Sequence, residues 1–182
     1  MAEFIPTNEY EASHQIDAMS FHEDVYTLMT IFLSSKHFLD IDVEDNKNAE
    51  PPYSGTRYWA HLAEEVETRK IPRLLVSIAT TLRVKTDDGG WWSDNSNSVG
   101  TLSKGALNHQ PEVLSMREAC NKIIHATKVH YDVEPINDFE HIGNKFRYLN
   151  PMIYLYGENR GKKWKACLDI HSFCKGCLET IF

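Results

Sequence analysis

The chain has 182 residues, of which 42% are hydrophobic, including four Trp, eight Tyr and eight Phe. A chain of this length and apolar content can bury a core as one domain, which excludes a mainly disordered protein. The net charge is −7, with 8 Lys/Arg against 17 Asp/Glu in residues 1–103 and 11 against 9 in residues 104–182. Non-specific nucleic-acid binders are usually basic, so contact with RNA is left open only for the C-terminal part.

The sequence also lacks the usual marks of membrane and secreted proteins. No apolar run approaches the roughly 20 residues that span a bilayer. The N-terminal stretch MAEFIPTNEYEASHQ is too acidic and polar for a secretory signal, and the four cysteines do not follow a small secreted pattern. We therefore expect a cytoplasmic protein with reduced thiols and no membrane partner.

The first part of the chain predicts an N-terminal arm and long helices. Residues 1–19 are expected to be a loose arm. A helix is expected from Ser20, where SFHE has the pattern of a capping box, to about Leu39. A second helix is expected over residues 56–70, and Pro72 either kinks it or opens a third helix with the sequence PRLLVSIATTLRV.

Helical periodicity is lost over residues 86–110, a loop long enough to be functional or mobile. Its Trp91-Trp92 pair is expected to anchor in the core, with contact to a partner as the alternative. A fourth helix is expected over residues 111–128, with a proline in its first turn. After it, HYDVEPINDF, FRYLNPMIYLYGE and KKWKACLDI have the aromatic and β-branched composition of strands, and GENRGKK predicts a hairpin turn.

We therefore predict one α+β domain over residues 1–182 that is mainly helical. A four-helix bundle in residues 20–128 is followed by a small antiparallel β-sheet in residues 129–182 and a short C-terminal helix capped by Ser172. The predicted hairpin turn NRGKK, at residues 159–163, forms a basic tip that either contacts a phosphate backbone or is simply solvated.

The predicted helix at residues 111–128 carries Arg117, Asn121 and His125 at four-residue spacing. On a helical wheel these side chains flank the apolar arc and so border the core. Histidine can transfer protons near neutral pH, arginine can stabilise phosphate charge and asparagine can orient either neighbour. Such a set needs no metal or cofactor. The same spacing also fits a purely structural role for these residues at the edge of the core, in which the arginine pairs with a carboxylate.

The sequence CNKIIH, which ends at His125, resembles the motif of the HEPN superfamily: an arginine, four to six residues, and a histidine. The family has a four-helix bundle, and many members are metal-independent ribonucleases of toxin–antitoxin and phage-defence systems. Their active site forms where two such helices meet in a dimer. The chain departs from the motif at Cys120, where the family has arginine, while Arg117 stands one turn earlier.

The resemblance implies a homodimer that acts on RNA, with no cofactor. His125 would transfer the proton, Arg117 would contact the phosphate and Asn121 would orient the neighbouring groups. Because Cys120 replaces the arginine of the motif, the resemblance equally implies a protein that binds RNA without cleaving it. The alternative is a non-enzymatic protein–protein interaction module that uses the margin of the helix at residues 111–128 and the Trp91-Trp92 loop.

One further group of residues has the chemistry of a metal site. Four potential zinc ligands lie within eleven residues: Cys167, His171, Cys174 and Cys177. They come from one short strand-to-helix segment, whereas structural zinc sites usually join two separated segments. Free cysteines are also common in protein cores, so we expect no metal here.

Overall fold

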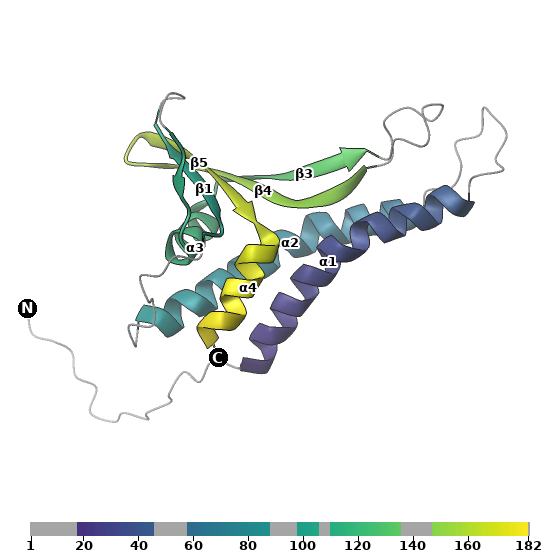
Figure 1. Cartoon of the computed structure of the whole chain (residues 1–182), viewed down its shortest axis with the longest axis horizontal. Coiled ribbons are helices and arrows are strands. Elements are labelled where there is room, and N and C mark those ends of the chain that lie inside the picture. Colours follow the sequence, from purple (N-terminus) through teal and green to yellow (C-terminus); the bar gives the residue numbers. More distant parts are fainter. Residues whose placement is uncertain (1–17, 46–57, 88–97, 106–109, 136–146, 182) are drawn as a thin grey trace, which may run out of the picture.

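The computed structural model describes residues 18–45, 58–87, 98–105, 110–135 and 147–181 (Figure 1). The elements in chain order are α1 (Ala18–Asp45), α2 (Tyr58–Asp87), β1 (Gly100–Lys104), β2 (Glu112–Val113), α3 (Met116–His125), β3 (Lys128–Pro135), β4 (Arg147–Asn159), β5 (Lys162–Asp169) and α4 (Ile170–Ile181). The predicted α+β class, mainly helical, is confirmed. None of the helices in the described ranges is long and apolar enough to cross a bilayer.

Helices α1 and α2 lie side by side and run in opposite directions (Figure 1). Apolar residues recur at helical spacing along α1, so one stripe of it is buried in the core. The helix begins before Ser20, which therefore lies inside the first turn and is not the predicted cap. It also continues past Leu39 to Asp45, and Asp42 in its last part is buried.

Asp42 links the two helices. Its side chain is only 1% exposed, and its carboxylate accepts hydrogen bonds from the backbone N–H groups of Trp59 (3.1 Å) and Ala60. These N–H groups lie at the start of α2, where a helix leaves its donors without internal partners and where a negative charge is favourable. Local sequence patterns do not reveal this cap, because Asp42 lies 17 residues before Trp59.

Helix α2 is continuous although Pro72 lies inside it. Of the two alternatives for Pro72, a kink within the helix or the start of a third helix, the second is therefore wrong, and residues 58–70 and the segment after Pro72 belong to one helix. A proline inside a helix costs about 3 kcal/mol. On either side of it, Ile71 and Leu75 are almost completely buried, and burial of each such side chain contributes about 1.5–3 kcal/mol. Packing thus outweighs the local preference to stop.

The five strands form one antiparallel sheet in the order β2-β1-β5-β4-β3. The three strands predicted near the C-terminus are confirmed as β3, β4 and β5, whereas β1 and β2 were not predicted. One apolar core joins all four helices to one face of the sheet. The residues of that inner face are Leu102, Leu149, Ile153, Leu155, Trp164, Ala166 and Leu168.

The hairpin turn predicted within GENRGKK is confirmed: two residues, Arg160-Gly161, join β4 to β5. Both residues have positive φ angles, 51° and 77°, as in the type I′ turns that close tight hairpins. Next to the turn, Gly157 pairs with Trp164 across the strands, and a Cβ atom at position 157 would overlap the indole ring. The glycine therefore lets this ring approach the backbone of β4.

Helix α3 is shorter than predicted at both ends. It begins after Ser115, whose hydroxyl accepts a hydrogen bond of 3.3 Å from the N–H of Glu118. The residues before it pair with β1 instead, and the residues after it enter β3. The sequence predicted a four-helix bundle over residues 20–128. The described part of this range contains three helices, α1, α2 and α3, and α3 packs against α2.

The predicted C-terminal helix is confirmed as α4, but its cap differs from the prediction. The N–H of Ser172 donates a hydrogen bond of 2.7 Å to the carboxylate of Asp169. Asp169 is the last residue of β5 and therefore caps α4, whereas Ser172 lies in its first turn.

Candidate functional site

The face of the sheet that points away from the helices, the outer face, is defined here by Lys128, His130, Tyr154, Tyr156, Lys165 and Cys167. Directly opposed residues of an antiparallel pair share a face, and Tyr156 is opposed by Lys128 on one side and Lys165 on the other. Their neighbours along the strands, such as Leu155 and Ala166, are fully buried. The outer face thus carries aromatic and basic side chains that are exposed or half-buried.

Two tyrosines on the outer face lie close to one lysine. The Nζ atom of Lys165 is 4.5 Å from the ring centroid of Tyr154 and 5.8 Å from that of Tyr156. His130 meets Tyr156 edge-on, with ring centroids 5.3 Å apart. The negative charge of Asp132 raises the pKa of Tyr154. Exposed rings of this kind can stack on planar bases, and an ammonium group beside them can pair with phosphate.

A groove of about 380 Å³ lies beside these rings, where β3 begins next to the β4–β5 hairpin. Its lining residues, which define the hairpin groove, are Thr127, Lys128, His130, Tyr156, Gly157, Glu158, Lys163 and Trp164. At one end the backbone N–H of Thr127 donates a hydrogen bond of 2.8 Å to the carbonyl of Tyr156. Ligand pockets span roughly 300–1,000 Å³. The groove is therefore large enough for a small planar group, with aromatic and basic side chains around it.

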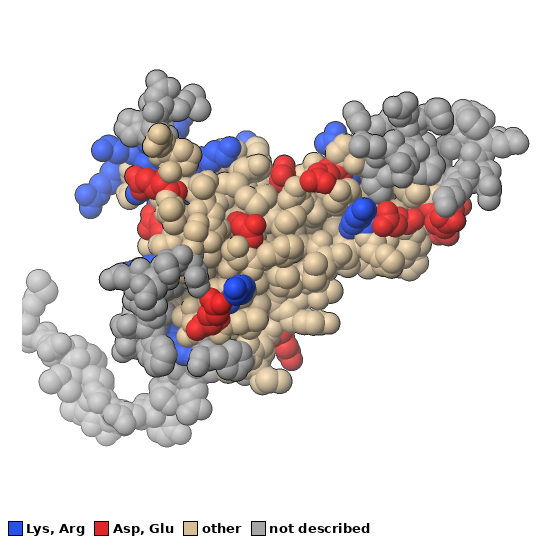
Figure 2. All heavy atoms as spheres, in the orientation of Figure 1, with Lys and Arg blue, Asp and Glu red and all other residues tan. Residues whose placement is uncertain are grey.

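The β4–β5 hairpin makes one end of the outer face basic. Residues 160–165 read Arg-Gly-Lys-Lys-Trp-Lys, with four basic side chains and no acidic one. Figure 2 shows Lys and Arg side chains gathered over this hairpin, at the upper left of the view, with acidic side chains beside them; Glu158 of the hairpin lies opposite Lys163. The whole chain carries a net charge of −7, so this local excess of positive charge marks the hairpin as a place where an anion would be attracted.

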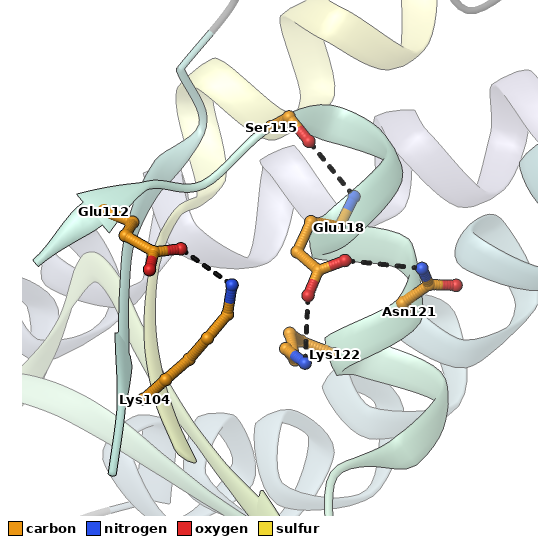
Figure 3. A network of polar contacts seen from close by, with 6 residues as sticks. All are labelled: Lys104, Glu112, Ser115, Glu118, Asn121 and Lys122. Atoms are coloured by element: carbon orange, nitrogen blue, oxygen red, sulfur yellow. Dashed lines mark hydrogen bonds and ion pairs between the residues drawn. The ribbon is translucent and has the colours of Figure 1, made fainter. Parts of the chain in front are cut away.

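The three candidate residues of α3 do not form one cluster. Arg117 and His125 are exposed. They are eight residues apart, which separates them by roughly 12 Å along the helix axis at 1.5 Å per residue. The amide of Asn121 donates a hydrogen bond of 3.5 Å to the carboxylate of Glu118 (Figure 3). Asn121 is thus engaged within the helix and does not bridge the other two residues.

Glu118 belongs to a polar network that lines the contact between α3 and the sheet (Figure 3). Its carboxylate is 3.0 Å from the Nζ atom of Lys122, and Lys104 pairs with Glu112 at 2.7 Å. Burial raises the pKa of Glu118, but the hydrogen bond and charge of Lys122 outweigh it and hold the pKa below its ordinary value. Lys122 also lies 4.7 Å from the ring centroid of Trp164. The Lys122–Trp164 contact connects α3 to β5, whereas the Glu118–Lys122 pair lies within α3 and the Lys104–Glu112 pair joins β1 to β2.

Cys120, at the position where the HEPN motif has arginine, is fully buried. Burial raises the pKa of its thiol to about 12. The side chain belongs to the same core as Cys174 and Cys177 of α4. Since position 120 faces the core, a residue there does not share the exposed margin of Arg117 and His125.

The four potential zinc ligands near the C-terminus do not converge. Cys167 is half-buried on the outer face and His171 is exposed on α4, whereas Cys174 and Cys177 are buried in the core. In the part of the chain that the structure describes, no three His, Cys, Asp or Glu side chains are grouped so as to hold a metal ion.

Comparison of the chain with protein-family models, with curated proteins and with solved structures gives no match in any of the three. The candidate site therefore depends on the residues of this chain alone. The basic tip at residues 159–163 was indicated by the sequence, and the Trp91-Trp92 pair lies outside the described residues. The outer face was missed, although the alternation Tyr-Leu-Tyr at residues 154–156 is the pattern that signals it.

Proposed function

We propose that the protein binds single-stranded RNA on the outer face of the sheet and in the hairpin groove. The observation that carries the proposal is the position of the Lys165 ammonium, within cation–π distance of both Tyr154 and Tyr156 on solvent-facing strands. Proteins that bind single strands combine aromatic rings, on which bases stack, with positive charge along the path of the backbone. Both features occur together here.

The charge distribution favours a short binding site. Four basic residues lie within residues 160–165, whereas the chain as a whole is acidic and would repel a long polyanion. Rings that lie on an open sheet need unstacked bases, which single strands offer and duplexes do not. We therefore expect the protein to bind a few nucleotides, to prefer single strands and to lose affinity as salt concentration rises.

The proposal is tested by fluorescence anisotropy with a short, labelled, single-stranded RNA of mixed sequence. Stacking on an aromatic side chain contributes roughly 1–3 kcal/mol per base. Replacing Tyr154 and Tyr156 together by Ala should therefore lower the affinity by at least about tenfold. The matched control is Tyr26→Ala, which removes a tyrosine that is 74% exposed on α1. Equal affinity of the double variant and the wild type would contradict the proposal, as would tighter binding of duplex RNA.

A second candidate function is metal-independent cleavage of the bound RNA by α3, as the HEPN resemblance implies. It is favoured by the exposure of both Arg117 and His125. One chain holds these side chains roughly 12 Å apart along the helix, too far for both to act on one phosphate. In a two-fold dimer that packs α3 antiparallel to its copy, Arg117 of one copy would lie opposite His125 of the other.

Cleavage is tested with RNA in the presence of a chelator. The wild type should cleave, His125→Ala and Arg117→Ala should each be inactive, and a mixture of the two variants should regain part of the activity, because mixed dimers contain one intact site. Lys175→Ala, an exposed change on α4, serves as the control. Cleavage that persists in His125→Ala would exclude this role. If neither binding nor cleavage occurs, the protein–protein interaction module becomes the preferred function.

A further inference from the structure

Another cavity, of about 340 Å³, lies between the helix pair and the strands β3 and β4. The residues that line it are Ser35, Leu39, Ala60, Ala63, Glu64, Glu67, Thr68, Tyr131, Val133, Arg147, Tyr148 and Leu149. The small side chains of Ala60 and Ala63 on α2 leave space opposite the sheet. We call it the α2 cavity, and it shares no residue with the hairpin groove.

Glu67 is the half-buried acid of the α2 cavity. Burial raises the pKa of its carboxyl group, the nearby Glu64 raises it further, and a hydrogen bond from Ser35 lowers it only in part. Burial and the charge of Glu67 also raise the pKa of Tyr131, which lies across the cavity on β3. Among the described residues, no lysine or arginine lowers the pKa of Glu67. A carboxylate in this position would be stabilised by a positive group from a ligand.

Arg147, the first residue of β4, supplies a positive charge to the same cavity. Among the described residues, no ion pair joins its guanidinium to the carboxylate of Glu67. Apolar side chains, among them Leu39 and Leu149, contribute the wall of the cavity along with these polar groups. The cavity therefore presents an acid pair, an apolar wall and a guanidinium.

We propose that the α2 cavity binds a small ω-amino acid, with its ammonium group at Glu67 and Glu64 and its carboxylate at Arg147. A guanidinium can bind a carboxylate through two parallel hydrogen bonds, and an ammonium group satisfies a partly buried carboxylate. The methylene chain of the ligand contacts the apolar wall. An ω-amino acid carries its two charges at opposite ends of a methylene chain, so it can present one charge to Glu67 on the α2 side of the cavity and the other to Arg147 on the β4 side.

The experiment is isothermal titration calorimetry with 5-aminopentanoate as the probe, and with pentylamine and pentanoate as analogues that each keep one charge. The zwitterion should bind at least tenfold more tightly than either analogue. Glu67→Gln and Arg147→Gln should each weaken its binding at least tenfold. The matched controls are Glu65→Gln and Arg73→Gln, which change exposed α2 residues outside the cavity and should leave binding unchanged.

Two results would overturn the proposal: absence of binding by the folded wild type, or equal binding of pentylamine and 5-aminopentanoate. Arg147 is exposed, so Arg147→Gln keeps the test valid even where a change at Glu67 perturbs folding. The proposal does not depend on RNA binding, because the two cavities are lined by different residues.

Discussion

Successive side chains of β4 enter two different environments. Ile153 and Leu155 are fully buried against the helices, whereas Tyr154 and Tyr156 lie on the outer face beside Lys165. Successive side chains of a β-strand point to opposite faces of the sheet, so a regular strand is enough to produce this separation. Substitutions on the inner face should therefore lower the stability of the protein, and substitutions on the outer face should weaken its binding of RNA.

Leu155→Ala is expected to have the largest effect on stability. Removing a fully buried leucine side chain leaves a cavity, so the free energy of unfolding should fall by about 2–5 kcal/mol. Urea denaturation measures this loss. Tyr156→Ala, one residue further along the strand, should cost about 1 kcal/mol or less, because its ring is only half-buried. Similar losses for the two variants would remove the distinction between the faces.

Replacing Lys162 and Lys163 together by Ala should weaken RNA binding through charge alone. For single strands, the slope of log K against log salt is about −0.7 per phosphate contact. Loss of two contacts should therefore make the slope shallower by about 1.4, and the affinity at low salt should fall roughly tenfold. Anisotropy titrations at several salt concentrations measure both quantities. An unchanged slope would show that the basic hairpin does not contact the RNA.

Glu67→Gln is expected to have a small effect on stability that depends on pH. The folded state raises the pKa of Glu67, chiefly through burial, so the folded protein holds this proton to a higher pH than the unfolded chain does. The associated stability is complete below the unfolded pKa and is lost as pH rises through the folded pKa. The variant should therefore melt roughly 1–3 °C above the wild type at pH 7 and at the same temperature at pH 4.

Thermal denaturation of Glu67→Gln and the wild type across this pH range measures the difference, with Glu65→Gln as the exposed control. A variant that is less stable than the wild type at pH 7 would mean that the carboxylate makes a stabilising contact, and the α2 cavity would then need no ligand.

Local sequence patterns were sufficient to predict part of the fold. The hairpin at Arg160-Gly161 was predicted because its turn chemistry and the flanking β-branched and aromatic runs act over a few residues. Strand β2 was missed because two residues are too few to show alternation. The continuity of α2 through Pro72 was missed because tertiary packing outweighs the local signal, and the capping role of Asp42 joins residues that are distant in the chain.

The candidate sites, like the fold, could be predicted only where their residues are contiguous in the sequence. The basic tip at residues 159–163 is contiguous and was recognised in the sequence. The outer face is not contiguous, because Tyr156 meets His130 and Lys165 only through the register of three strands. No sequence motif marks the α2 cavity, because its lining residues come from two helices and two strands.

The most direct test of the central claim is photo-crosslinking of the protein to single-stranded RNA that contains 4-thiouridine, followed by mass spectrometry of the crosslinked peptides. Binding on the outer face predicts crosslinks in the segment 154–165, which holds both tyrosines and the basic hairpin, and their loss when Tyr154 and Tyr156 are replaced by Ala. Crosslinks confined to α3, or to α1 and α2, would contradict the assignment of RNA to the sheet.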